Sequence, residues 1–319
     1  MSRNIMQSIK KRVINFAGND RGFTIIELLI SIGITALVSA SLFTIYQSQQ
    51  DTFIQQGFVR ERNQNVRVAM DWISKDLRMA GYMVNNSSGL VAFNSSVEAD
   101  EIYISDYETI APGTLATAIP LGTTLANLAV SGSTTLQLTS LDIDNDGASD
   151  FTVEGGLIIS DGTNTEGFRI DSIVGMNITI SGTPNTSTAG RSLVNNYATA
   201  NTTVMPAIRY TVDTSTTFPS LRRNNDILTE GIEDVQIAFG RDTTGNGTVD
   251  IWLNNANVTG TQLDADVKSV RISVVGRTSK ADQGLQRVFN QTLEDRTMNI
   301  TDDYRRLTLD NQIVRLRNF

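Results

Sequence analysis

Residues 23–46 read FTIIELLISIGITALVSASLFTIY and carry one charged side chain, that of Glu27. A helix rises about 1.5 Å per residue, so a helix over this segment is about 36 Å long. That length is enough to cross the roughly 30 Å hydrocarbon core of a bilayer. The segment therefore predicts a transmembrane helix.

Basic residues precede this segment and predict its orientation. Residues 1–22 carry five basic side chains against Asp20, a net charge of +4, whereas the whole chain has −8. The rest of the chain therefore carries −12, and no basic residue follows the apolar segment before Arg60. Because basic flanks stay in the cytoplasm, we expect a single pass with residues 47–319 outside the cytoplasm. A secretory signal peptide fits poorly, since the apolar run is long and no small-residue cleavage site closes it.

Glu27 calls for an explanation, because a carboxylate within a membrane helix costs about 2.5–3.5 kcal/mol. If the chain is cut between Gly22 and Phe23, the new α-amine lies about one helical turn before Glu27. An acidic side chain in the first turn also stabilises the helix dipole. Glu27 is therefore predicted to pair with this amine, in its own chain or in a neighbouring one.

The composition excludes many kinds of site. The 319 residues include no Cys and no His, which removes disulfides, thiolate and imidazole metal ligands, and the most common catalytic bases and nucleophiles. We therefore expect no enzyme. The net charge of −8 also argues against a nucleic-acid partner, because phosphate binding needs a basic face.

The remainder of the chain predicts an amphipathic helix followed by strands. Residues 47–81 continue the helix, with Val66, Met70, Ile73 and Leu77 on one stripe. From residue 82 to 319, short alternating apolar runs predict strands. These strands are expected at 101–105, 134–141, 167–174, 177–181, 207–212, 235–240, 267–276 and 311–316. The fold class expected is α+β: a long N-terminal transmembrane helix packed on an antiparallel β-rich globular head.

Two acidic loops of this head are candidate calcium sites. In the first, carboxylates occupy alternate positions around a Gly, as at the start of a calcium-binding loop, and Ala148 would add a backbone carbonyl. Its candidate ligands are Asp142, Asp144, Asp146, Ala148 and Asp150. The second loop has fewer carboxylates and predicts weaker binding. Its candidate ligands are Asp242, Thr244, Asn246, Thr248 and Asp250. Ordinary hairpin turns are the alternative for both loops. Apart from calcium, no cofactor is expected.

Residues 21–30, RGFTIIELLI, resemble the processing site of type IV pilins and type II secretion pseudopilins. The resemblance implies that residues 1–22 are a prepilin leader and that a prepilin peptidase cuts between Gly22 and Phe23. It also implies N-methylation of Phe23 and a role for Glu27 in guiding the subunit into a filament. The resemblance implies a pilin-like architecture as well.

Three further stretches resemble PilW-type minor pilins. They are DWISKDLRMAGY at residues 71–82, GIEDVQI at 231–237 and IVRLRN at 313–318. The first stretch is also similar to pseudopilin J of type II secretion, which stays open as an alternative. A tip-exposed adhesin or a calcium-controlled binding module is a third possibility, favoured by the large head and its acidic loops.

The resemblance implies a structural role and a set of partners. The expected function is that of a minor pilin that primes or caps a type IV pilus, or fimbrium. The expected partners are the prepilin peptidase, other minor and major pilins, the inner-membrane assembly platform and, before assembly, the lipid bilayer. The expected location is the bacterial inner membrane and then the pilus at the cell surface.

Overall fold

The computed structural model describes residues 23–82, 84, 89–108, 122–181, 191–254, 266–282 and 284–317. The leader, with Gly22, lies outside the described residues. The chain divides into two units, Met1–Gln55 and Gln56–Phe319. One long helix, α2 (Ile25–Met79), contributes residues to both units.

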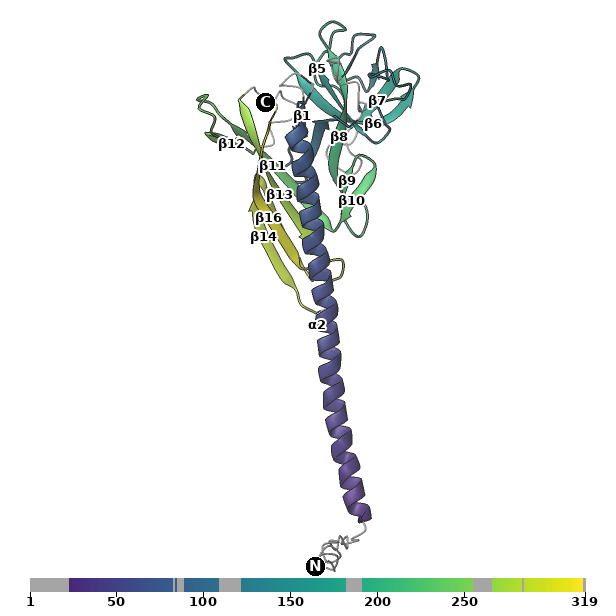
Figure 1. Ribbon diagram of the computed structural model, residues 1–319, viewed down its shortest axis with the longest axis vertical. Coiled ribbons are helices and arrows are strands. Elements are labelled where there is room, and N and C mark those ends of the chain that lie inside the picture. Colours follow the sequence, from purple (N-terminus) through teal and green to yellow (C-terminus); the bar gives the residue numbers. More distant parts are fainter. Residues whose placement is uncertain are drawn as a thin grey trace, which may run out of the picture. The chain divides into compact units, whose positions relative to one another are not determined.

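The second unit contains all the described strands (Figure 1). They are β1 (Leu90–Phe93), β2 (Glu101–Ser105), β3 (Thr123–Thr124), β4 (Thr135–Gln137), β5 (Gly156–Ser160), β6 (Thr165–Val174), β7 (Asn177–Ser181), β8 (Thr203–Asp213), β9 (Ser220–Arg223), β10 (Asp226–Glu230), β11 (Ile232–Arg241), β12 (Ile251–Leu253), β13 (Val267–Arg277), β14 (Arg287–Leu293), β15 (Arg296–Asp302) and β16 (Arg306–Arg315).

These strands pair antiparallel in three groups. A ten-stranded sheet follows the order β1-β2-β8-β5-β6-β7-β4, with β3 and β9 also paired to β8 and β10 paired to β9. A four-stranded sheet has the order β12-β11-β13-β16, and β14 and β15 form a separate hairpin. The expected α+β class, with a long apolar N-terminal helix and an antiparallel head, is thus confirmed.

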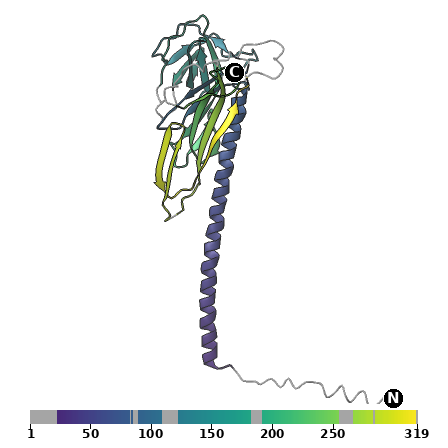
Figure 2. The ribbon, with the colours of Figure 1, turned by 90° about the vertical axis from the view of Figure 1, so that its left-hand side faces the viewer.

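The main core lies between the last part of α2 and both sheets. The predicted stripe of Val66, Met70, Ile73 and Leu77 is buried there, against apolar side chains of β1, β2, β8, β11, β13 and β16. Strands β13 and β16 run alongside this part of the helix (Figure 2). At Gly276 the strand has no side chain, and a Cβ there would overlap Val66 Cγ2. This glycine therefore permits the close approach of helix and strand.

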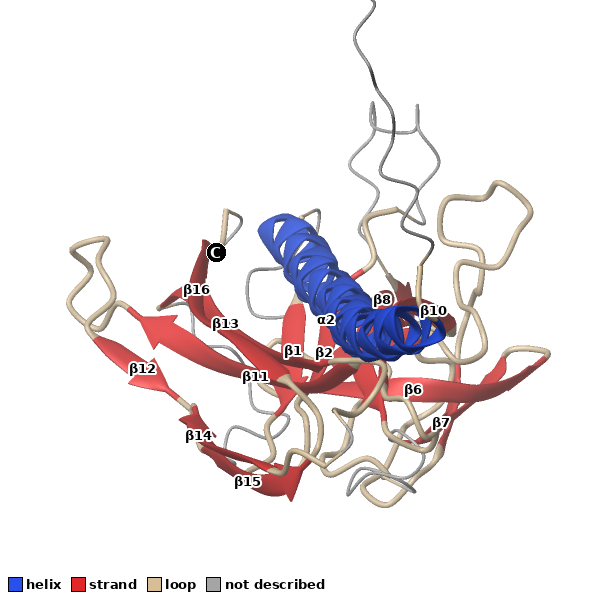
Figure 3. Cartoon of the chain, turned by 90° about the horizontal axis from the view of Figure 1, so that it is seen from below, coloured by secondary structure: helices blue, strands red, loops and turns tan. Residues whose placement is uncertain are grey.

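Three smaller cores complete the described part of the head. One lies within the large sheet and includes Leu157, Phe168 and Ile178. A second lies around Tyr103 and Met205. The third places Leu293 and Met298 of the β14–β15 hairpin against Val275. Alternate residues of β13 face α2, so the hairpin covers the opposite face of the four-stranded sheet (Figure 3).

A buried carboxylate links the helix to the large sheet. Asp76 is fully buried and accepts hydrogen bonds from Tyr210 Oη at 2.6 Å and from Tyr107 Oη at 3.2 Å. Arg223 donates to the same carboxylate through Nε at 2.9 Å and to Glu108 at 2.7 Å. Burial and the negative charge of Asp76 raise the pKa of Tyr210, so the phenol stays protonated and donates. The Asp76 carboxylate thereby fixes the helix to β8 through Tyr210 and to β9 through Arg223.

The structure adds strands that the sequence patterns did not predict. The predicted strands 101–105 and 177–181 match β2 and β7, and 167–174 lies within β6. The 134–141 segment forms a regular strand only over Thr135–Gln137. The hairpin β14–β15 was not predicted, because its residues are mostly polar and mostly exposed. In the turn of this hairpin Glu294 has a φ of 52°, a conformation that glycine usually adopts. Arg271 donates two hydrogen bonds of 2.7 Å to the Glu294 carboxylate.

Candidate functional site

The start of α2 holds Glu27 in a reciprocal set of hydrogen bonds. The backbone N–H and the hydroxyl of Thr24 both donate to Glu27 Oε2 at 3.0 Å. The N–H of Glu27 donates to Thr24 Oγ1 at 3.3 Å. This arrangement is a capping box, which satisfies two backbone donors at a helix start. The sequence interpretation missed the role of Thr24, although Thr-x-x-Glu before an apolar run is the signal for such a cap.

The helix beyond this cap presents apolar side chains to its surroundings. Phe23 is 85% exposed, and side chains such as Ile25 and Leu37 are more than 70% exposed. Within the described residues, α2 is long and apolar enough to cross a membrane, and none of its most apolar stretch is buried. Such a surface requires lipid or other subunits around it. The helix thus fits a membrane anchor.

The predicted cleavage site lies directly before this helix. Phe23 and Thr24 precede the first helical residue, and Gly22 falls outside the described residues. Cleavage at Gly22, methylation of Phe23 and assembly through Glu27 stay predictions.

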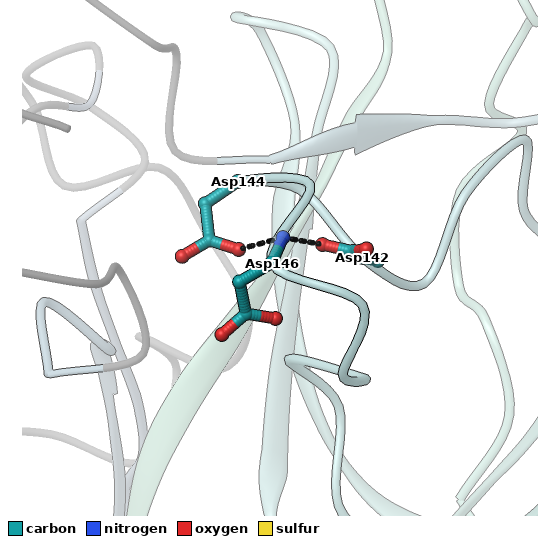
Figure 4. A group of neighbouring side chains, drawn as sticks. All are labelled: Asp142, Asp144 and Asp146. Atoms are coloured by element: carbon teal, nitrogen blue, oxygen red, sulfur yellow. Dashed lines mark hydrogen bonds between the residues drawn. The ribbon is translucent and has the colours of Figure 1, made fainter.

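The first acidic loop brings three carboxylates together (Figure 4). One oxygen from each of Asp142, Asp144 and Asp146 lies within 4.8 Å of the other two. The N–H of Asp146 donates to Asp142 Oδ1 and to Asp144 Oδ1, both at 3.1 Å, and that of Gly147 donates to Asp142 Oδ2 at 2.9 Å. These bonds curl the backbone so that the side chains converge. Carboxylate oxygens at this spacing match the ligands that Ca²⁺ prefers.

Asp150 closes this loop from its far end. The N–H of Ile143 donates to Asp150 Oδ2 at 2.6 Å, and the Asp150 side chain is mostly buried. Burial raises the pKa of Asp150, and the negative charges of Asp144, Asp142 and Asp146 raise it further. A cation at the loop would offset this repulsion. Asp150 therefore supplies a fourth negative charge to the loop, while Ala148 donates its N–H to Asp146 at 2.8 Å.

The second acidic loop satisfies its carboxylates internally. Asp242 accepts the N–H groups of Gly245, Asn246 and Gly247 at 2.7 to 3.1 Å. Although desolvation acts to raise the pKa of Asp242, these three amides together lower it. Asp250 likewise accepts the N–H and hydroxyl groups of Thr243 and Thr244. The loop thus holds its shape through its own donors.

The other candidate ligands of the second loop also bond within it. Asn246 Oδ1 accepts the N–H and the hydroxyl of Thr248. The Thr244 hydroxyl lies between the two carboxylates, 3.1 Å from Asp250 Oδ2 and 3.5 Å from Asp242 Oδ1. Among the described residues, only the first loop brings three acidic side chains to metal-ligand spacing. Calcium binding at either loop, and weaker binding at the second, stay predictions.

Comparison with known families gives two matches at opposite ends of the chain. Residues 18–43 match the prokaryotic N-terminal methylation motif, and residues 185–318 match the type IV pilus-assembly protein W. No curated protein and no solved structure matches the chain. At its N-terminus the chain is thus similar to proteins that carry this methylation motif. Over residues 185–318 it is similar to a type IV pilus-assembly protein, and the two matches together support a PilW-like type IV minor pilin.

The PilW match covers strands β8 to β16, and so the whole four-stranded sheet. The second acidic loop lies inside the match, whereas the first lies before it. One of the two models describes a type IV pilus-assembly protein, and the other describes an N-terminal methylation motif.

Proposed function

We propose that this chain is a minor pilin that primes or caps a type IV pilus in the bacterial inner membrane. The leader is removed between Gly22 and Phe23, and Phe23 is then N-methylated. The observation that carries the proposal is Glu27, a carboxylate held at the start of an exposed apolar helix. After cleavage the α-amine belongs to Phe23, one residue before the capping box. The Glu27 carboxylate can pair with this amine or with the α-amine of a neighbouring subunit.

The proposal makes the charge of Glu27 essential for entry into filaments. Glu27→Ala is expected to reduce incorporation into pili at least tenfold, while membrane insertion and leader removal persist. Insertion improves if anything, because a charge that costs about 2.5–3.5 kcal/mol in the bilayer is removed. The measurement is the amount of this chain in sheared pili relative to the membrane fraction.

Glu27→Gln separates the charge from the helix cap. A neutral amide oxygen can still accept the hydrogen bonds of Thr24, so this variant keeps the cap and removes the ion pair. We expect Glu27→Gln to fail like Glu27→Ala. Normal incorporation of Glu27→Gln would contradict the assembly role of the charge. Protein secretion lost with pilus assembly intact would favour the pseudopilin alternative.

We further propose that the first acidic loop binds one Ca²⁺ through Asp142, Asp144, Asp146 and Asp150, with a backbone carbonyl from Ala148. Two observations support this proposal. The carboxylates of Asp142, Asp144 and Asp146 lie close together. The pKa of Asp150 is raised by burial and by the negative charges of these three residues. Calcium affinity is expected to fall as the pH drops and these carboxylates become protonated. An adhesive head controlled by calcium would use this site.

Calcium is expected to raise the melting temperature of the full-length chain in detergent. A ligand that binds only the folded state stabilises it by about 2.7 kcal/mol at a hundredfold excess over its Kd. For a head of this size that shift is about 5–10 °C. Asp144→Ala should abolish most of the difference between calcium and chelator.

Asp242→Ala is the matched control, and it should leave most of the difference in place. For each variant, the melting temperature in calcium is compared with the melting temperature in chelator. This comparison is needed because Asp242→Ala also removes three hydrogen bonds and so lowers both melting temperatures. If the unmodified chain has the same melting temperature in calcium and in chelator, the first loop does not bind calcium and is an ordinary acidic turn.

A further inference from the structure

Arginines of the head are mostly ion-paired within the chain. Eleven arginines in the described strands and loops pair with a carboxylate of the same chain. Examples are Arg209 with Glu101 and Arg306 with Glu233. Because the chain outside the leader is acidic, carboxylates are available to neutralise most cations. A group of arginines without such partners is therefore informative.

One pocket of the head gathers four cationic side chains. It has a volume of about 660 Å³ and is lined by Arg78 at the end of α2, Lys268 at the start of β13, and Arg315 and Arg317 at the end of β16. No carboxylate lines it, and Arg78, Arg315 and Arg317 form no ion pair with any carboxylate of the described residues. All three arginines are exposed. Like charges in one pocket repel each other, so this arrangement favours an anionic partner.

The pocket also has apolar walls and a strand edge. Val314 and Leu316 contribute to its lining, and Ile313 is 53% exposed beside them. Strand β16 is the last strand of its sheet in the described part of the chain, so its outer backbone groups have no strand partner there. A free strand edge accepts an extended polypeptide through backbone hydrogen bonds. A polyphosphate would use the cations but would make no use of the apolar side chains or the edge.

We propose that this pocket and the end of β16 bind an extended acidic segment of another protein subunit. The segment adds to the edge of β16, its acidic side chains pair with Arg78, Arg315 and Arg317, and its alternate apolar side chains cover Ile313. The pocket lies at the Arg78 end of α2, about 33 Å along the helix from Gln56, where the head unit begins. The binding surface is thus distinct from the apolar helix that carries filament assembly.

The test uses the full-length chain in detergent and a short labelled peptide that alternates Glu and Val. We expect the peptide to bind, and the affinity to fall with rising salt concentration. Arg315→Glu with Arg317→Glu should weaken binding roughly tenfold or more. Arg60→Glu with Arg67→Glu is the matched control, since both side chains are exposed on α2 and the change in net charge is the same. This control should leave the affinity unchanged.

Further probes separate the possible partners. A peptide of the same sequence with N-methylated backbone amides cannot add to a strand edge, so its binding should be lost. Duplex DNA and vesicles with anionic phospholipid should bind far more weakly than the peptide. Stronger binding of DNA or vesicles through Arg315 and Arg317, equal binding of the N-methylated peptide, or no peptide binding would each overturn the proposal. Filament entry through Glu27 can succeed or fail independently of all these results.

Discussion

Gly22→Leu is expected to abolish leader removal, so that the protein accumulates in the membrane with its first 22 residues attached. A glycine next to the cut bond lets the backbone approach an enzyme closely, and a leucine side chain blocks that approach. Without cleavage Phe23 has no α-amine, so it cannot be N-methylated. Mass spectrometry of the N-terminal peptide should show methylated Phe23 in the unmodified protein and the intact leader in the variant.

Gly18→Leu is the control for this experiment. It makes the same change in the same leader, four residues before the cut, and should leave processing intact. A mature protein that starts at Phe23 in the Gly22→Leu variant would refute the assigned site. A start after residue 46 in the unmodified protein would instead show that the apolar segment is a signal peptide.

Asp76→Ala is expected to lower the free energy of unfolding of the head by about 3–5 kcal/mol, because removing one member of a buried ion pair leaves the other charge uncompensated. Arg223 would lose its buried partner, and the hydroxyls of Tyr210 and Tyr107 would lose their acceptor. Urea unfolding of the full-length chain in detergent, followed by tryptophan fluorescence, measures the change. Trp72 lies one turn before Asp76 and under the Arg223 guanidinium, so its emission reports on this region.

Asp71→Ala provides the comparison on the same helix. Asp71 is exposed, and surface substitutions of this kind change stability by roughly 0.5 kcal/mol or less. Similar unfolding midpoints for the two variants would show that the buried cluster around Asp76 contributes little to the attachment of the helix.

The sequence predicted the elements that depend on local patterns. The stripe from Val66 to Leu77 follows helical spacing and is buried as that spacing requires. Strands with alternating apolar residues, such as β7, were found for the same reason. The hairpin β14–β15 lacks such a pattern, because only a few of its side chains touch the sheet.

The environment of Asp76 could not be predicted, because its partners come from positions 107, 210 and 223. Only the folded chain brings them together. The basic pocket was missed for a similar reason, since its cations come from Arg78, Lys268 and the end of β16. The capping box of Thr24 and Glu27 was also missed, although it is local and could have been predicted from the spacing of the two residues.

That capping box affects how long a single subunit can remain in the bilayer. Hydrogen bonds from Thr24 partly replace the water that the Glu27 carboxylate loses in lipid, so a monomer can diffuse laterally without a partner. If Glu27 pairs with the α-amine of a neighbouring subunit as proposed, joining a filament exchanges these local hydrogen bonds for an intermolecular ion pair. Leaving the filament would restore the local hydrogen bonds, which would lower the energetic penalty of disassembly. Subunits in the membrane could then enter and leave filaments repeatedly.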